Sequence, residues 1–175
     1  MAYVVDVLYF KQTDDGLIVK EMAIASVNSI ENPKVYLFKP PFAWYKLSKK
    51  CRRKNLFLEL YHHGFEWKSG TYEFSSIISL VQLNLSDATI VYVNSNVIKE
   101  WMENFNCKVI DLSEVGYEND YFSNSECNHH NRTYRTSCAL HNVKKMKQFV
   151  NEHRDRKRKY HDGLPSCSTG MDTAG

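Results

Sequence analysis

The chain has 175 residues, of which 43% are hydrophobic and 13% aromatic, and a formal net charge of +3. This length supports one domain with a full hydrophobic core, and the aromatic content excludes an intrinsically disordered chain. We recognise no signal peptide and no apolar run long enough to cross a membrane, and the five cysteines are an odd number. We therefore expect no membrane association and a reducing, intracellular location, cytoplasmic or nuclear.

Apolar residues recur at strand or helix spacing in eight segments along the chain. The expected strands are residues 3–10, 17–27, 34–38, 88–93 and 108–112, and the expected helices are residues 72–85, 97–105 and 138–153. Turn residues between the first two strands predict a hairpin. This order predicts an α/β fold with a mixed five-stranded sheet, antiparallel over its first three strands and flanked by helices. We assign residues 1–153 to this domain and residues 154–175 to a basic and then polar, disordered tail.

A segment between the third strand and the first expected helix combines aromatic and basic residues. Positive side chains interleaved with rings suit a phosphate backbone and stacked bases. The candidate nucleic-acid contacts are Lys46, Lys49, Lys50, Arg52, Arg53 and Lys54. A solvated helix face beside core aromatics is the alternative interpretation of the same segment.

A compact group of potential metal ligands lies just before the last expected helix. Cys127, His130 and Cys138 follow the spacing C-x2-H-x7-C, and zinc binds thiolate sulfur and imidazole nitrogen in a tetrahedron. A complete site needs a fourth ligand from elsewhere in the chain. The alternative is that these cysteines are small buried apolar residues and the histidine is an ordinary one.

The order of elements, with Asp6 in the first strand, resembles the RNase H-like fold of the DEDDh 3′–5′ exonucleases. Such enzymes hold two divalent metals with carboxylates from the first strand, a middle helix and the last helix. Here most of those carboxylates are replaced. Their positions fall on Leu8 in the first strand, on Val97 or Ile98 in the middle helix and on Asn142 in the last helix, where Ser137 also stands for the motif histidine.

A closer resemblance is to the Maelstrom domain, a branch of the same fold. Its cysteine and histidine spacing is met by Cys127, His130 and Cys138, which Ala139 and Leu140 follow. That family lacks the exonuclease carboxylates and carries a Glu-Cys-His-Cys zinc site, so the resemblance implies Glu21 in the second strand as the fourth ligand. The implied cofactor is a structural zinc ion that ties a strand, a loop and a helix together.

The expected function is a catalytically degenerate exonuclease-fold domain that binds RNA or single-stranded nucleic acid, and the missing carboxylates favour a protein that is not an enzyme. One alternative is a metal-independent RNA nuclease, with His62, His63, His129 or Asp6 as weak acid–base candidates. Another is an adaptor domain that binds a protein partner through exposed aromatic residues, namely Trp44, Tyr45 and Trp67.

Overall fold

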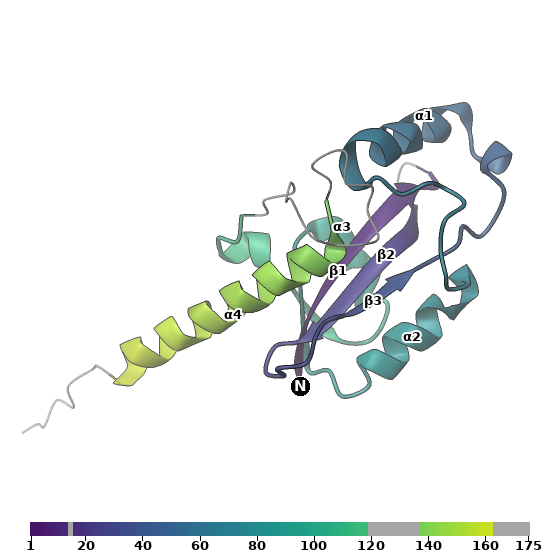
Figure 1. The fold of residues 1–175 in the computed structure, drawn as a ribbon. Coiled ribbons are helices and arrows are strands. Elements are labelled where there is room, and N and C mark those ends of the chain that lie inside the picture. Colours follow the sequence, from purple (N-terminus) through teal and green to yellow (C-terminus); the bar gives the residue numbers. More distant parts are fainter. Residues whose placement is uncertain (14–15, 119–136, 163–175) are drawn as a thin grey trace, which may run out of the picture.

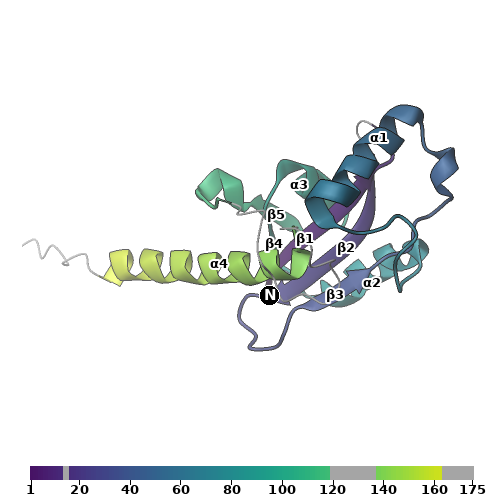
Figure 2. The same ribbon diagram turned by 45° about the horizontal axis from the view of Figure 1, so that its top comes forward.

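The computed structural model describes residues 1–13, 16–118 and 137–162, with side chains described as far as residue 156. The strands are β1 (Ala2–Lys11), β2 (Leu17–Ser26), β3 (Lys34–Leu37), β4 (Ile90–Val93) and β5 (Lys108–Asp111). The helices are α1 (Lys49–Leu58), α2 (Ile77–Asn84), α3 (Asn96–Glu103) and α4 (Ala139–Asp162). Figures 1 and 2 show the sheet with helices on both of its faces. No helix in this described part is long and apolar enough to cross a membrane.

The five strands form one mixed sheet in the order β3-β2-β1-β4-β5. β1 and β2 pair antiparallel, as do β2 and β3, which confirms the predicted antiparallel opening. β4 pairs parallel with β1, and β5 pairs parallel with β4. The carboxyl ends of β1, β4 and β5 therefore meet at one edge of the sheet, which is where sites of α/β proteins gather.

Alternation of side chains along β1 builds a core on each face of the sheet. Val5 and Val7 pack in one apolar cluster with residues of α2 and α3. Val4 and Leu8 point to the other face and pack in a second cluster with residues of α4, including Met146. The placement of α4 across one face and of α2 and α3 on the other is visible in both views (Figures 1 and 2).

Helix α1 belongs to a segment for which the sequence periodicity predicts no regular element, and Asn55 fixes it to the end of β1. The side-chain amide of Asn55 is fully buried, accepts a hydrogen bond of 2.7 Å from the Lys11 backbone N–H and donates one of 2.8 Å to the Lys11 carbonyl. These two bonds copy the backbone pairing of a neighbouring strand. A third apolar cluster, formed by Phe10, Leu47 and Trp67 among others, fills the space beneath α1.

A β-bulge in β2 turns Lys20 into the protein. Leu8 pairs with Glu21 and Tyr9 pairs with Val19, which leaves Lys20 without a partner in the β1 ladder. Its ammonium group is buried and donates to the carbonyl oxygens of Phe38, Trp67 and Ser69. A single side chain thus ties β2 to the chain that leaves β3 and to the chain that returns from α1.

Helix α4 is longer than the sequence pattern predicts. It continues to Asp162 through the basic residues that we assigned to a disordered tail, and Figure 1 shows its second half extending away from the sheet. Among its residues with described side chains, which end at residue 156, the last buried one is Val150. The rest of the predicted tail, residues 163–175, lies outside the described part of the chain.

Candidate functional site at the carboxyl edge of the sheet

A pocket of about 260 Å³ opens at the carboxyl edge, between β1, the end of β4 and the beginning of α4. Its lining includes Asp6 and Leu8 from β1, His62 and His63 from the turn after α1, Asn94, Ser95 and Ile98 from the β4–α3 junction, and Ser137 and Asn142 from the start of α4. The fold thus brings together the turn after α1 and the three segments to which the resemblance assigns exonuclease motif positions, namely the first strand, the middle helix and the start of the last helix. We call this hollow the edge pocket.

Asp6 is the carboxylate of the edge pocket. Its side chain faces α4 and is 1% exposed, and its Oδ2 accepts a hydrogen bond of 2.7 Å from Nδ2 of Asn142. Burial raises the pKa of Asp6 to about 6, although hydrogen bonds from Asn142, the Val7 backbone and Asn94 act in the opposite direction. Among the described residues that line the pocket, Asp6 is the only carboxylate, so the structure offers no second one there for a pair of divalent ions.

His62 and His63 end a π-helical turn at Glu59–His63, which Gly64 terminates in the left-handed conformation (φ 70°). The carbonyl oxygen of His62 accepts a hydrogen bond of 2.6 Å from the Ser137 N–H, which joins this turn to the start of α4. Burial lowers the pKa of His62, so its imidazole is neutral near pH 7. A neutral ring at this position can accept a proton.

His63 is held more rigidly than His62. It is 1% exposed, its ring packs edge-on against Phe10 with 4.7 Å between centroids, and its Nδ1 accepts a hydrogen bond of 3.2 Å from the Phe65 N–H. With Nδ1 as acceptor, the proton of the neutral ring lies on Nε2. These contacts make His63 mainly part of the core beneath the pocket.

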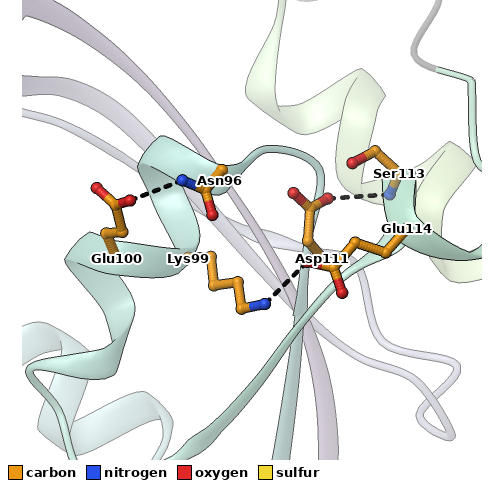
Figure 3. A network of polar contacts seen from close by, with 6 residues as sticks. All are labelled: Asn96, Lys99, Glu100, Asp111, Ser113 and Glu114. Carbon is orange, nitrogen blue, oxygen red and sulfur yellow. Dashed lines mark hydrogen bonds and ion pairs between the residues drawn. The ribbon is translucent and has the colours of Figure 1, made fainter.

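A second buried carboxylate at this edge of the sheet, Asp111, has a structural role. It ends β5, and its Oδ1 accepts a hydrogen bond of 2.9 Å from the Ser113 N–H, which caps the turn at Leu112–Val115. Figure 3 shows this bond beside the ion pair of 2.9 Å between Lys99 and Glu114, which joins α3 to the same turn. Asp111 does not contribute to the lining of the edge pocket.

Two of the four predicted zinc ligands lie next to each other, on the same face of the sheet as Asp6. Glu21 is fully buried, and its Oε2 accepts a hydrogen bond of 2.9 Å from the Ala139 N–H at the start of α4, directly after the buried Cys138. A carboxylate at a helix N-terminus is stabilised by the exposed N–H groups and the helix dipole. Cys127, His130 and His129 lie outside the described residues, and residues 1–13, 16–118 and 137–156 contain no group of three metal-ligating side chains.

The six predicted nucleic-acid contacts lie on α1 or just before it. All are exposed except Arg52, which is half-buried. Lys49 and Arg53 continue at four-residue spacing into Phe57 and Tyr61, whose side chains are 60% and 62% exposed and whose rings are 5.2 Å apart. We call these four residues the α1 stripe. None of these four residues lines the edge pocket, but Leu58 and His62, which follow the two rings of the stripe in the sequence, do.

The exposed pair of rings formed by Phe57 and Tyr61 was not predicted from the sequence. The predicted exposure of Trp67 is wrong. The four-residue spacing of Arg53, Phe57 and Tyr61 is the sequence pattern from which a shared helix face could have been predicted. Trp67, predicted to be exposed, is instead 5% exposed because it packs in the cluster beneath α1, whereas Tyr45 is 74% exposed as predicted.

The edge pocket thus unites one buried carboxylate, a neutral imidazole, the Lys11 side chain and several amide and hydroxyl groups. Glu21 and Cys138 lie close together at the first turn of α4. Comparison of the chain with models of known protein families and with curated proteins finds no match.

Proposed function

We propose that this chain is a catalytically degenerate, RNase H-like exonuclease-fold domain, related to the Maelstrom domain, that binds RNA or single-stranded nucleic acid. We propose further that Glu21, Cys127, His130 and Cys138 hold a structural zinc ion. The observation that carries the proposal is the α1 stripe, a solvent-exposed row of basic and aromatic side chains that runs from α1 into the turn whose residues His62 and His63 line the edge pocket.

The chemistry of the edge pocket supports the degenerate part of the proposal. The resemblance assigns the exonuclease motif positions to Asp6, Leu8, Val97 or Ile98, Ser137 and Asn142, and all of these except Val97 line this pocket. Two divalent cations a few ångström apart repel each other and require several anionic ligands. A single carboxylate with a pKa of about 6, in a pocket that is also lined by Lys11, is a poor site for such a pair.

The α1 stripe supports binding of a single strand. Phe57 and Tyr61 offer ring faces to unpaired bases, and base stacking contributes about 1–3 kcal/mol per base. Lys49 and Arg53 extend the stripe with positive charge for phosphates. Lys49 lies in the first turn of α1, where the helix dipole disfavours a cation and where no acidic residue is present. The positive charge of Lys49 therefore does not stabilise the helix, and its presence calls for another explanation.

The donor set at the start of α4 fits a closed zinc site. Glu21 and Cys138 are buried and adjacent, and one carboxylate, one imidazole and two thiolates are zinc ligands of ordinary type. Zinc held by four protein ligands would leave no position for a water molecule, so its contribution is to stability. Cys127 and His130 would supply the remaining two ligands.

The direct test is fluorescence anisotropy with labelled 20-nucleotide RNA, single-stranded DNA and duplex RNA at several salt concentrations. We expect the single strands to bind, with affinity that falls as salt rises, and the variant K49E/R53E to bind at least tenfold more weakly. The control variant K108E/K144E changes the charge equally at exposed positions on β5 and α4. Salt-independent affinity, or equal losses in both variants, would rule out a site on α1.

A second candidate function is metal-independent RNA cleavage, because the fold brings two of the weak acid–base candidates together. Asp6 and His62 line the same pocket. Burial raises the pKa of Asp6 to about 6 and lowers the pKa of His62. In such a reaction His62 would remove the proton of a ribose 2′-hydroxyl. The 2′-oxygen would attack the adjacent phosphorus, and the 5′-oxygen would leave with a proton from a second group, giving a 2′,3′-cyclic phosphate.

Incubation of labelled RNA and the matching DNA with excess EDTA tests this candidate. Cleavage of the RNA alone, with a cyclic phosphate end and its loss in H62A, is the expected result. The matched control is H153A, a change of a histidine on α4 away from the edge pocket. Intact RNA, or equal activity in H62A and the unmodified protein, would exclude His62 as the base.

A further inference from the structure

A second hollow, of about 710 Å³, lies on another side of α1 from the α1 stripe. Its walls include four aromatic residues, Phe42, Trp44, Tyr45 and Trp67, together with the carboxylates of Glu59 and Glu66. We call it the aromatic groove. None of its lining residues lines the edge pocket, so the two hollows are separate sites.

Three of the rings form a fixed floor. The Trp44 and Trp67 rings are nearly perpendicular, at 70° with centroids 5.2 Å apart, and Phe42 lies 5.9 Å from Trp67. The indole N–H of Trp67 donates a hydrogen bond of 3.3 Å to the Phe42 carbonyl, and the buried Lys20 donates one of 3.0 Å to the Trp67 carbonyl. Tyr45, which is 74% exposed, stands at the rim. A ligand would therefore meet rings whose positions are already set.

The groove also carries negative charge. Glu59 is half-buried, and burial raises its pKa, with the nearby charge of Glu66 acting in the same direction. The Trp67 backbone N–H and the charge of Lys20 lower that pKa. The Lys20 ammonium interacts with the charges of both Glu59 and Glu66, but it does not line the groove and donates its hydrogen bonds to three carbonyl oxygens. Lys68 is the cation that lines the groove, and it is exposed. Two carboxylates beside aromatic faces attract a cation with an apolar or planar surface.

We propose that the aromatic groove binds an arginine side chain presented by a peptide segment of a protein partner. A guanidinium group is planar and weakly hydrated, so it stacks on Trp44 or Tyr45. Its N–H groups donate to the carboxylates of Glu59 and Glu66, often in pairs. A trimethylated ammonium stacks on the same rings but has no hydrogen to give to a half-buried carboxylate, and a lysine ammonium is strongly hydrated and less suited to stacking. Nucleic acid is disfavoured because both carboxylates repel phosphate.

Arginine binding in the aromatic groove does not depend on nucleic-acid binding by the α1 stripe. It is tested on the full chain with the peptide Gly-Arg-Gly-Arg-Gly and with three versions in which citrulline, lysine or trimethyllysine replaces both arginines. Citrulline keeps the shape of arginine and removes its charge. We expect the arginine peptide to bind at least tenfold more tightly than the citrulline peptide and at least threefold more tightly than the other two. Spectra of ¹⁵N-labelled protein should show shifted indole signals for Trp44 and Trp67, with Trp101 on α3 unchanged as an internal control.

Two variants locate the contact. We expect E66Q, at an exposed position, to weaken binding of the arginine peptide at least threefold, and E59Q/E66Q to weaken it at least tenfold. E103Q, an equal charge change on α3, should leave it unchanged. For each variant, a melting temperature within 2 °C of that of the unmodified protein excludes misfolding. If E59Q/E66Q does not meet this criterion, the single variant E66Q still tests the proposal. Equal binding of the citrulline peptide, tighter binding of the trimethyllysine peptide, or equal losses in E66Q and E103Q would each overturn the proposal.

Discussion

Asn142 and Asp6, which are 136 residues apart in the sequence, are joined by a hydrogen bond of 2.7 Å from Nδ2 to Oδ2. The bond links the first turns of α4 to the middle of β1. An amide at position 142 donates to the buried carboxylate without adding charge, so Asp6 can remain inside the protein without a neighbouring cation. The exonuclease pattern, with an aspartate there, would need metal to hold the two carboxylates together.

The substitution N142D should be strongly destabilising at neutral pH. It removes the donor and places a second carboxylate beside Asp6, which leaves buried charge uncompensated and costs about 3 kcal/mol or more of the free energy of unfolding. Urea denaturation at pH 8 and pH 4 measures this cost. We expect most of the loss at pH 8 and a smaller loss at pH 4, where the carboxylates bind protons. Asparagine and aspartate have nearly the same size and shape, so a cavity cannot cause the loss of stability. Equal losses at pH 8 and pH 4 would contradict an explanation based on charge.

The substitution D6N should stabilise the protein in a pH-dependent way. The pKa of Asp6 is about 6 in the folded protein, against 3.8 for an unperturbed aspartate, so the folded state binds more protons between these values. The contribution of Asp6 to stability is therefore complete below about pH 4 and is lost as the pH rises through 6. A shift of this size corresponds to about 3 kcal/mol.

We therefore expect the stability difference between D6N and the unmodified protein to increase by about 2.4 kcal/mol from pH 4 to pH 7. Urea denaturation across this range gives the difference directly. D87N, a change at an exposed aspartate that bonds to Tyr3, is the control and should not reproduce this profile. A difference that is constant over pH would mean that Asp6 titrates alike in the folded and unfolded states.

Removal of zinc and substitution of its proposed ligands should lower the stability together. We expect purified protein to contain one zinc ion per chain, and a strong chelator or C138S to lower the melting temperature by more than 10 °C. Metal analysis and calorimetry make the measurement. C107S, at a cysteine on the other side of the sheet packed with the α2–α3 cluster, is the control and should keep its zinc.

E21Q separates the two roles open to Glu21. A glutamine still accepts the hydrogen bond from the Ala139 N–H, so the cap on α4 is weakened and not lost, and this change alone costs about 1 kcal/mol or less. Loss of zinc from E21Q would show that the carboxylate is a ligand. Full zinc content with a small loss of stability would show that Glu21 only caps α4.

The substitution N55A should detach α1 from the end of β1. It leaves the Lys11 N–H and C=O without their partners at a part-buried position, which costs about 1 kcal/mol for each unsatisfied group, near the lower end of the range for buried groups. We expect a loss of at least 2 kcal/mol in urea denaturation and faster amide exchange at Lys11. N104A, at an exposed asparagine on the surface that follows α3, is the control and should cost under 1 kcal/mol.

Replacement of Lys49 by glutamate should change stability and nucleic-acid binding in opposite directions. A negative side chain in the first turn of α1 interacts favourably with the helix dipole, so we expect the free energy of unfolding to increase by about 0.5 kcal/mol. Affinity for single-stranded RNA should fall at least threefold at low salt. Thermal denaturation and anisotropy on the same sample give both values. A lower stability together with weaker binding would indicate a folding defect.

Much of the edge pocket could be predicted from the sequence, because most of its residues belong to strands and helices whose order is recognisable in the sequence. Asp6 lies in a β-branched run, and Ser137 and Asn142 flank the start of a periodic apolar segment. Asn94 and Ser95 reach the same pocket because β1 pairs parallel with β4 and parallel strands end at one edge, whereas Asn142 meets Asp6 because α4 packs against β1. The Leu17–Ser26 strand was likewise recognisable from the turn before it and its apolar pattern.

Other features depend on partners that are distant in the sequence. The role of Asn55 depends on the backbone of Lys11, and the inward turn of Lys20 depends on a bulge that composition does not reveal. The end of α4 is a different case. No glycine or proline occurs between Cys138 and Asp162, and Gly163 follows at once. The glycine therefore marks the end of α4 in the sequence, whereas the run of charged residues after His153 is equally typical of a disordered tail.

The three carbonyl oxygens around the Lys20 ammonium make this amine a chemical reporter of the fold. Burial lowers its pKa to about 8, so near that pH much of it is a free amine, the form that acylating reagents attack. The same burial denies reagents access while the chain between α1 and the sheet stays in place. The rate at which Lys20 is acylated, compared with that of an exposed lysine such as Lys108, would therefore measure how often this part of the protein opens.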